Sequence, residues 1–207
     1  MLSAMRIIAG SLRSRTLIAP PGLATRPTSD RLRETLFNVL APRIVGAAFL
    51  DLYAGSGAVG IEALSRGAVR VDFVEREPRA LKVLRGNLER LGLRAGFRIH
   101  ACAVAAFLRR AAAAAPKRER DGKREHYEVL FLDPPWDAAG EYAATLGLLG
   151  GSAAGLLAVD ALVIAEHRRK QRLEDRYGSL ERTRLLEQGD AALSFYALAQ
   201  SSAPEIH

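Results

Sequence analysis

Short apolar runs alternate with longer stretches in which apolar residues recur three and four positions apart. The runs predict buried strands and the longer stretches predict amphipathic helices, and their alternation is typical of an α/β fold with a mostly parallel sheet. The expected strands are residues 49–51, 71–75, 97–101, 127–133, 161–165, 180–187 and 191–199. The expected helices are residues 30–40, 58–66, 78–91, 104–115 and 141–149. The last two strands flank a short turn and should close the sheet as an antiparallel pair.

Two segments between these elements show neither periodicity. Residues 117–125 hold five basic and three acidic residues, which predicts an exposed loop. Such a charge run is more typical of solvated surface than of a binding site. Residues 150–155 consist of Gly, Ser and Ala and are expected to be flexible.

The loop after the first strand is rich in glycine. Gly55, Gly57 and Gly60 follow the apolar run, and a helix is expected from Ala58. Strand, glycine-rich turn and helix form the opening unit of a nucleotide-binding α/β sheet. Glycine allows a tight turn and lets the backbone approach a ligand without a Cβ in the way. The helix N-terminus adds unpaired N–H groups to the same space. Alone, these glycines also fit a purely structural turn.

Two carboxylates near this turn discriminate between candidate nucleotides. The glycine spacing also fits a dinucleotide such as NAD. Asp51, however, lies four residues before the first glycine, where it would crowd a pyrophosphate but suits the ammonium of a methionine moiety. Glu75 ends the next strand and can accept hydrogen bonds from two ribose hydroxyls. The two acids together indicate S-adenosylmethionine (SAM) as the cofactor, with NAD as a distant alternative.

A second motif, Asp133-Pro134-Pro135-Trp136, directly follows the strand at 127–133. Ligands of open α/β sheets bind at the carboxyl ends of the strands, so this loop is expected beside the glycine turn. The Asp133 carboxylate and the Pro134 carbonyl can accept hydrogen bonds from an exocyclic amine of a nucleobase. The prolines stiffen the loop, and Trp136 can stack on a base that has been turned out of its helix. The alternative is a structural Pro-Pro loop with a core tryptophan.

The N-terminal segment is basic and reads as a β-hairpin, with strand-like runs at 6–10 and 16–19 joined by residues 11–15. Residues 1–46 contain seven arginines against two carboxylates, so they carry most of the net charge of +7. Arginine suits phosphate oxygens, which predicts an RNA-gripping arm. The alternative is a solvated edge hairpin, and Met5 is a possible start of the chain. The expected RNA-binding residues are Arg6, Arg13, Arg15, Arg26, Thr28 and Arg31.

The composition is consistent with one globular domain. We expect a basic arm at 1–27, a main domain at 28–200 and a tail at 201–207. Cys102 is the only cysteine, which excludes an internal disulfide and fits a reducing compartment. The four histidines lack metal-ligand spacing, so no metal site is expected. No membrane span or signal peptide is apparent, and we expect a cytoplasmic monomer.

These motifs together resemble the RsmD family, bacterial small-subunit rRNA guanine-N2 methyltransferases. The resemblance is carried by residues 6–10, 26–38, 50–57, 62–68 and 133–136, of which 26–38 is the most specific. It implies a Rossmann-like class I methyltransferase fold with a seven-stranded sheet. It also implies SAM as methyl donor and one guanine of 16S rRNA, in an assembled or assembling small subunit, as target. The implied catalytic residues are Asp133, Pro134, Pro135 and Trp136. The implied cofactor residues are Asp51, Tyr53, Ala54, Gly55, Ser56, Gly57, Glu75, Arg76, Cys102, Ala103 and Asp133.

One position departs from the family pattern. Many relatives carry Asp or Asn after the third strand to meet the adenine amine, but here this region reads Ala101-Cys-Ala-Val104. Backbone groups around Cys102 and Ala103 would therefore have to contact the adenine. Two other functions remain open: an adenine-N6 methyltransferase on DNA or RNA, which would use the same Asp-Pro-Pro loop, and a non-catalytic RNA-binding assembly factor.

Overall fold

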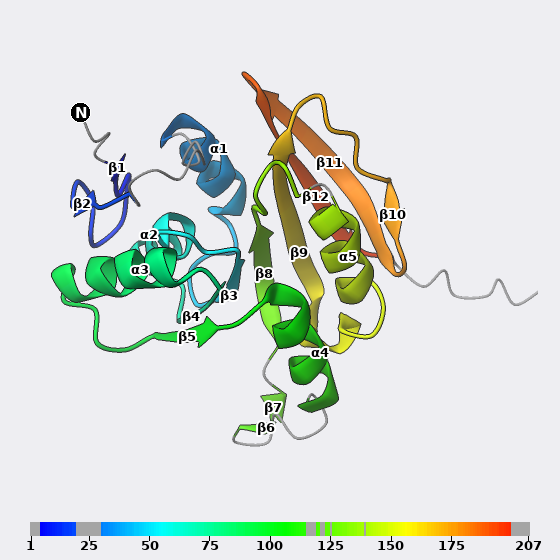
Figure 1. The fold of residues 1–207 in the computed structure, drawn as a ribbon, viewed down its shortest axis with the longest axis horizontal. Helices are drawn as coiled ribbons and strands as arrows, with labels where there is room; N and C mark the ends of the chain where they lie inside the picture. The colour runs from blue at the N-terminus through cyan, green and yellow to red at the C-terminus, as the bar shows by residue number, and fades with distance from the viewer. Residues whose placement is uncertain are drawn as a thin grey trace, which may run out of the picture.

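The computed structural model describes residues 5–19, 30–114, 119–120, 123–124, 126–138 and 140–199. Its central sheet has eight strands in the order β10-β11-β12-β9-β8-β3-β4-β5 (Figure 1). The strands are β3 (Ala48–Leu52), β4 (Arg70–Glu75), β5 (Phe97–Ala101), β8 (Tyr127–Leu132), β9 (Leu157–Arg168), β10 (Arg176–Tyr177), β11 (Leu180–Gln188) and β12 (Ala191–Leu198). The five neighbouring strands β9, β8, β3, β4 and β5 pair in parallel, whereas β12 is antiparallel to both β9 and β11. The expected seven-stranded, mostly parallel sheet is confirmed, with the two-residue β10 added at one edge.

Five α-helices cover the two faces of this sheet. They are α1 (Asp30–Leu40), α2 (Ala58–Ser65), α3 (Pro78–Arg90), α4 (Val104–Ala114) and α5 (Gly140–Leu149). Helices α1, α2 and α3 bury Leu36, Ile61 and Leu84 in one apolar cluster, and α4 and α5 bury Leu108 and Leu146 in a second one. In Figure 1 these two groups lie on opposite sides of the sheet. No helix in the described part of the chain is long and apolar enough to cross a membrane.

Two expectations about loops were wrong. Residues 119–120 and 123–124 pair as the short antiparallel strands β6 and β7, with Glu119 opposite Arg124. Strands of two residues are too short to show a periodicity in the sequence. The glycine-rich stretch at 150–155 is also tied down. The Gly150 carbonyl accepts the backbone N–H of Ser179 at 2.7 Å, and a Cβ on Gly150 would lie 1.7 Å from the carbonyl oxygen of Tyr177. That glycine permits close packing.

The N-terminal segment is held against the main domain. Its strands β1 (Met5–Arg6) and β2 (Thr16–Leu17) pair antiparallel, and both are shorter than expected. The segment contributes three buried side chains to the first apolar cluster, those of Met5, Ile7 and Leu17. The expected boundary at residue 27 lies outside the described residues, as does the tail at 201–207.

A buried carboxylate fastens this segment to the helices. Glu62 of α2 is fully buried and accepts the backbone N–H groups of Ile8 at 2.8 Å and Ala9 at 3.0 Å. Its other neighbours are Arg66, at 2.7 Å, and the fully buried Arg33 of α1, at 3.8 Å. Burial lowers the pKa of Arg33, and the nearby Asp30 and Glu62 carboxylates oppose that shift. Glu62 therefore supplies the buried negative charge beside Arg33 and also satisfies two backbone N–H donors.

We expect Glu62→Ala to lower the free energy of unfolding by about 3–5 kcal/mol, because it leaves Arg33 without a buried counter-charge. The measurement is urea denaturation followed by circular dichroism. Glu34→Ala is the matched control, since it removes an exposed carboxylate from the same region and should change stability by less than about 0.5 kcal/mol. Equal effects of the two substitutions would show that the Glu62 network contributes no net stability.

Candidate functional site

Three carboxylates meet at the carboxyl ends of the central strands. Strand β8 lies between β3 and β9, with Leu132 aligned with Leu52 on one side and Ala165 on the other. Asp133 and Glu166 each come directly after one of these aligned residues, on neighbouring strands. Asp51 lies near the end of β3. Asp51 and Glu166 are almost fully buried. The sequence predicted Asp51 and Asp133 here, and it also places Glu166 directly after the expected strand 161–165.

Burial is the main cause of raised pKa values at two of these acids, Asp51 and Asp133. Burial raises the pKa of Asp51 to about 7, and the hydrogen bond from the Gly60 N–H at 2.9 Å only partly opposes the shift. Burial, then the charges of Glu166 and Asp51, raises the pKa of Asp133 well above its usual range. A cation bound beside these acids would favour their ionised forms. The described residues contain no group of three or more His, Cys, Asp or Glu side chains with metal-site geometry.

The three glycines of the turn serve different purposes. A Cβ on Gly57 would lie 2.3 Å from Leu84, and one on Gly60 would lie 2.3 Å from Phe73 and 2.9 Å from the Asp51 carboxylate. These two glycines are therefore required for packing of α2 inside the protein. A Cβ on Gly55 would meet nothing closer than 4.0 Å. Of the three, only Gly55 has open space where a side chain would point.

Glu75 connects the second strand of the site to this turn. One carboxylate oxygen accepts the Gly55 N–H at 2.8 Å, and the other accepts those of Arg76 at 2.7 Å and Glu77 at 2.8 Å. Three backbone donors thus fix the carboxylate while leaving acceptor capacity for ribose hydroxyls. The exposed Arg76 side chain carries no such restraint.

Tyr53 is one of the remaining residues that were expected to bind the cofactor. Tyr53 has a positive φ of 63°, and its hydroxyl is 2.8 Å from Glu141 and 2.7 Å from Thr145 of α5. Burial raises the pKa of this hydroxyl. Tyr53 therefore ties the glycine turn to α5.

The other residues that were expected to bind the cofactor differ in burial and contacts. The Ser56 carbonyl accepts a hydrogen bond from Asn87 Nδ2 at 3.0 Å. Ala54 is buried, whereas Cys102 and Ala103 are half-buried just before α4.

The Asp-Pro-Pro-Trp loop is fixed by a turn and by one stacking contact. The Pro135 carbonyl accepts the Ala138 N–H at 2.8 Å, which closes the turn over Trp136. Pro134 is buried and Pro135 is exposed. The Arg168 guanidinium, at the end of β9, lies 4.9 Å from the centre of the Trp136 ring. Arg168 was not predicted as a site residue, because its contact depends on the neighbouring positions of β8 and β9.

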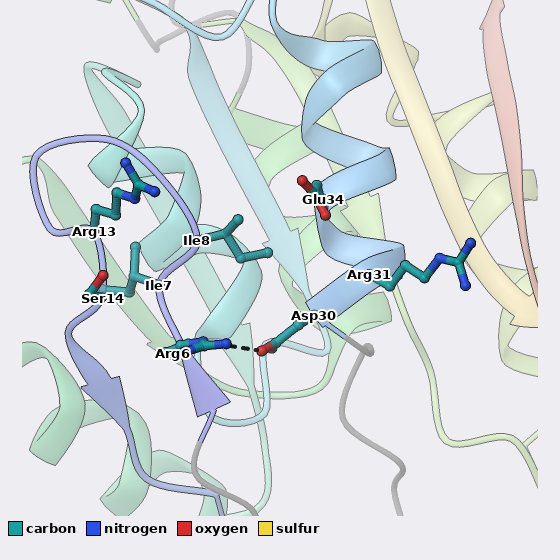
Figure 2. A pocket seen from close by; sticks show the side chains of 8 residues that line it. All are labelled: Arg6, Ile7, Ile8, Arg13, Ser14, Asp30, Arg31 and Glu34. Atoms are coloured by element: carbon teal, nitrogen blue, oxygen red, sulfur yellow. Dashed lines mark ion pairs between the residues drawn. The ribbon is translucent and has the colours of Figure 1, made fainter.

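Three of the predicted RNA-binding residues gather in one place. Arg6, Arg13 and Arg31 line a cavity of about 470 Å³ between the N-terminal segment and α1, shown in Figure 2. Asp30 lies in the same wall, 4.0 Å from the Arg6 guanidinium. Arg15 lies apart from this cavity and donates to the Arg90 carbonyl at 3.3 Å. Arg26 and Thr28 lie outside the described residues.

Gly55→Ala tests whether the open face of the turn binds SAM. Its φ of +55° strains any side chain, so the free energy of unfolding should fall by about 1–2 kcal/mol. Gly92→Ala is the matched control, since it has a φ of +72° with nothing within 4 Å, remote from the site. Calorimetry should show SAM affinity reduced at least about tenfold, or about 1.4 kcal/mol, by Gly55→Ala only. Unchanged affinity would exclude this backbone from the cofactor site.

Asp51→Asn should change the pH dependence of stability. Between the ordinary value of 3.8 and the folded value of about 7, the native state holds a proton that the unfolded chain has lost. The free energy of unfolding of the parent therefore falls as pH rises through this window. Asn carries no such proton, so the variant should gain stability relative to the parent between about pH 4 and about pH 8. Urea titrations at several pH values measure this, and parallel profiles for variant and parent would contradict it. The exposed Asp137→Asn is the control.

Comparison with known proteins agrees with this geometry. A family model described as "Conserved hypothetical protein 95" matches residues 5–197. "Ribosomal RNA small subunit methyltransferase D" of Escherichia coli K12 is 39% identical over 163 residues, which cover 78% of this chain and 74% of the relative. The Bacillus subtilis protein YlbH is 38% identical over 192 residues, covering 93% and 98%.

Solved structures show the same architecture along the whole chain. The structure of yhhF from Escherichia coli superposes with a TM-score of 0.77 at 32% identity, covering 95% of this chain and 98% of the other. A protein of Thermus thermophilus, TTHA0928, gives a TM-score of 0.76 at 33% identity, covering 94% and 99%. These matches extend over nearly the full length on both sides. This chain therefore belongs to the RsmD family of class I SAM-dependent methyltransferases.

Proposed function

We propose that this protein transfers the methyl group of SAM to the exocyclic N2 amine of one guanine in 16S rRNA of the small ribosomal subunit. The observation that carries the proposal is the position of the Asp133-Pro-Pro-Trp136 loop. It follows β8, the immediate neighbour of β3, from which the cofactor turn begins. The name of the Escherichia coli relative supports ribosomal RNA of the small subunit as the substrate.

The loop fits the chemistry that an aromatic amine requires. The nitrogen lone pair of such an amine is delocalised into the ring, so the amine is a poor nucleophile. Hydrogen bonds from its N–H groups to the Asp133 carboxylate and the Pro134 carbonyl favour a more tetrahedral nitrogen, whose lone pair is available. Trp136 offers an aromatic surface for the base, which must first leave its helix. After transfer the nitrogen is cationic and acidic, so its proton can leave at that stage. The amine therefore needs no deprotonation before the methyl group is transferred.

The residues around the cofactor turn fit SAM, which supplies a methyl group on a sulfonium. Asp51 and Asp133 place negative charge where a cationic cofactor is held, and their raised pKa values indicate that this charge lacks compensation in the free protein. Glu75 is oriented for ribose hydroxyls. Ala101 aligns with Glu75 across β4 and β5, so the backbone at Cys102 and Ala103 follows where the adenine would lie.

The competing functions make different products, so nucleoside identification tests the proposal. Small ribosomal subunits lacking the modification are incubated with methyl-labelled SAM, and the rRNA is digested to nucleosides. We expect labelled N2-methylguanosine. Labelled N6-methyladenosine would favour the adenine methyltransferase, and SAM binding without transfer would favour an assembly factor. We further propose that the enzyme is a monomer and acts in the cytoplasm. Sedimentation of the purified protein tests the monomeric state.

Substitutions of Asp133 test the role of its carboxylate. Asp133→Asn retains one acceptor oxygen and should be slower but measurable in single-turnover methyl transfer. Asp133→Ala removes the acceptor and should lose about 2–4 kcal/mol of transition-state stabilisation. SAM affinity should change much less than the rate in either variant, because the main loss belongs to the chemical step.

Asp137→Asn is the control for this series, since it removes an exposed charge from the same loop. The parent rate should also fall as pH is lowered through the raised pKa of Asp133, because a protonated carboxyl is a poorer acceptor, and Asp133→Asn should lose this dependence. If Asn and Ala variants are equally inactive, the charge itself is required. If the Ala variant is as fast as the parent, this loop is not catalytic.

A further inference from the structure

A second group of cations lies beside the catalytic loop. Strand β9 ends at Arg168, and the next residues supply Arg169, Lys170 and Arg172, so four of five consecutive residues are basic. Because β9 runs parallel to β8, this segment leaves the sheet at the same edge as the Asp-Pro-Pro-Trp loop. In Figure 1 the gold chain that follows β9 leaves the end of the strand and passes over to β10. All four basic residues are exposed.

The backbone of this segment is fixed, although its side chains are exposed. The Arg169 N–H donates to the Asp190 carbonyl at 2.8 Å, and the Gln171 N–H donates to the Arg168 carbonyl at 2.9 Å. Leu173 is buried in the second apolar cluster and anchors the far end. The cations are thus presented from a defined position at the rim of the site.

These cations differ from the arginines that follow them in the chain. Arg176 pairs with Glu181 and Arg182 pairs with Asp175, so both are occupied by ion pairs within the fold. Within the described residues, no ion pair joins Arg168, Arg169, Lys170 or Arg172 to a carboxylate. Arg168 instead lies over the ring of Trp136 at 4.9 Å. One face of the predicted stacking platform therefore carries a cation of this segment.

The charges below this rim have the opposite sign. Asp51, Asp133 and Glu166 form the floor of the site, and in their ionised forms they would repel the phosphates on either side of a nucleotide entering it. Cations at the rim offset that repulsion and bind phosphate oxygens through charge-assisted hydrogen bonds. Arginine is also suited to lie flat on an aromatic ring while its N–H groups bind elsewhere.

We propose that the basic rim, defined as Arg168, Arg169, Lys170 and Arg172, binds phosphates of the RNA strand next to the target nucleotide. Arg168 also acts as a positioning residue that holds Trp136 for stacking. The inference rests on the proposed RNA substrate. It adds a contact surface on the β9 side of the site to the arginines of the N-terminal segment. Helix α1 contacts the N-terminal segment through Arg33, which donates to the Arg6 carbonyl at 2.6 Å, and contacts β11 through Thr35, which bonds Gln188 at 3.1 Å.

The test compares two triple variants that each remove three exposed cations. The first is Arg169→Ala/Lys170→Ala/Arg172→Ala. The matched control is Lys82→Ala/Arg85→Ala/Arg94→Ala, which changes exposed positions on α3 and in the loop after it. Binding of each protein to unmodified small ribosomal subunits, and to the 16S rRNA alone, is measured at several salt concentrations. SAM affinity and circular dichroism establish that both variants are folded.

We expect the log–log salt slope of the rim variant to be shallower by roughly 2, at about 0.7 per lost phosphate contact, with the control slope unchanged. An unchanged slope for the rim variant, or equal losses in both variants, would overturn the proposal. A failure of the proposed function would be recognised by a different outcome. If the parent binds rRNA with the expected difference between variants but forms no methylguanosine, the rim stands and the reaction assignment does not.

The single tryptophan makes the role of Arg168 directly measurable. Trp136 is the only tryptophan of the chain, so intrinsic emission reports this loop alone. Arg168→Ala should increase quenching of that emission by acrylamide, reduce its response to added rRNA and leave SAM affinity unchanged. Arg168→Lys should restore part of the response, because Lys retains the cation but not the flat guanidinium. If both variants respond to rRNA as the parent does, Arg168 does not position Trp136.

Discussion

The close packing of α2 against the sheet is the constraint on which the cofactor site depends. A side chain at Gly57 or Gly60 would overlap Leu84 or Phe73, so the helix can approach this closely only where Cβ atoms are absent. That approach places the Gly60 N–H within hydrogen-bonding distance of Asp51. The shape of the turn and the orientation of a site carboxylate therefore follow from packing inside the protein. The half-buried Gly55, the proposed ligand contact of the turn, then lies at the end of a closely packed unit.

The acids at the strand ends are costly to the free protein. A pKa raised from 3.8 to about 7 means that ionising Asp51 in the folded protein costs about 4 kcal/mol more than ionising a solvent-exposed Asp. Asp133 and Glu166 add mutual repulsion on adjacent strands. A fold selected only for stability would place apolar residues here, as it does for Leu50 and Leu52 on the other face of β3. The proposed cationic cofactor would explain these acids, because its charge would offset both burial and repulsion.

The sequence predicted the elements of the main domain because their signals are local. Helix α1 was expected at 30–40 and is found at Asp30–Leu40, and the glycine turn and the Asp-Pro-Pro-Trp loop lie at neighbouring strand ends. What it missed depends on contacts distant in sequence. The Tyr53 hydroxyl reaches α5, which no pattern near Tyr53 indicates. Gly57 was read as clearing space for a ligand, but its nearest neighbour is Leu84.

The arrangement of charge around the site limits which part of an RNA can enter. Ionised acids in the floor would repel a phosphate, whereas the exposed cations of the proposed basic rim would attract it. A neutral base loses little on entering and can donate its amine hydrogens to the acceptors there. The same division of charge thus admits one base while holding the strand outside. A cationic cofactor in the floor completes the balance, since it neutralises the acids that would otherwise compete with one another for protons.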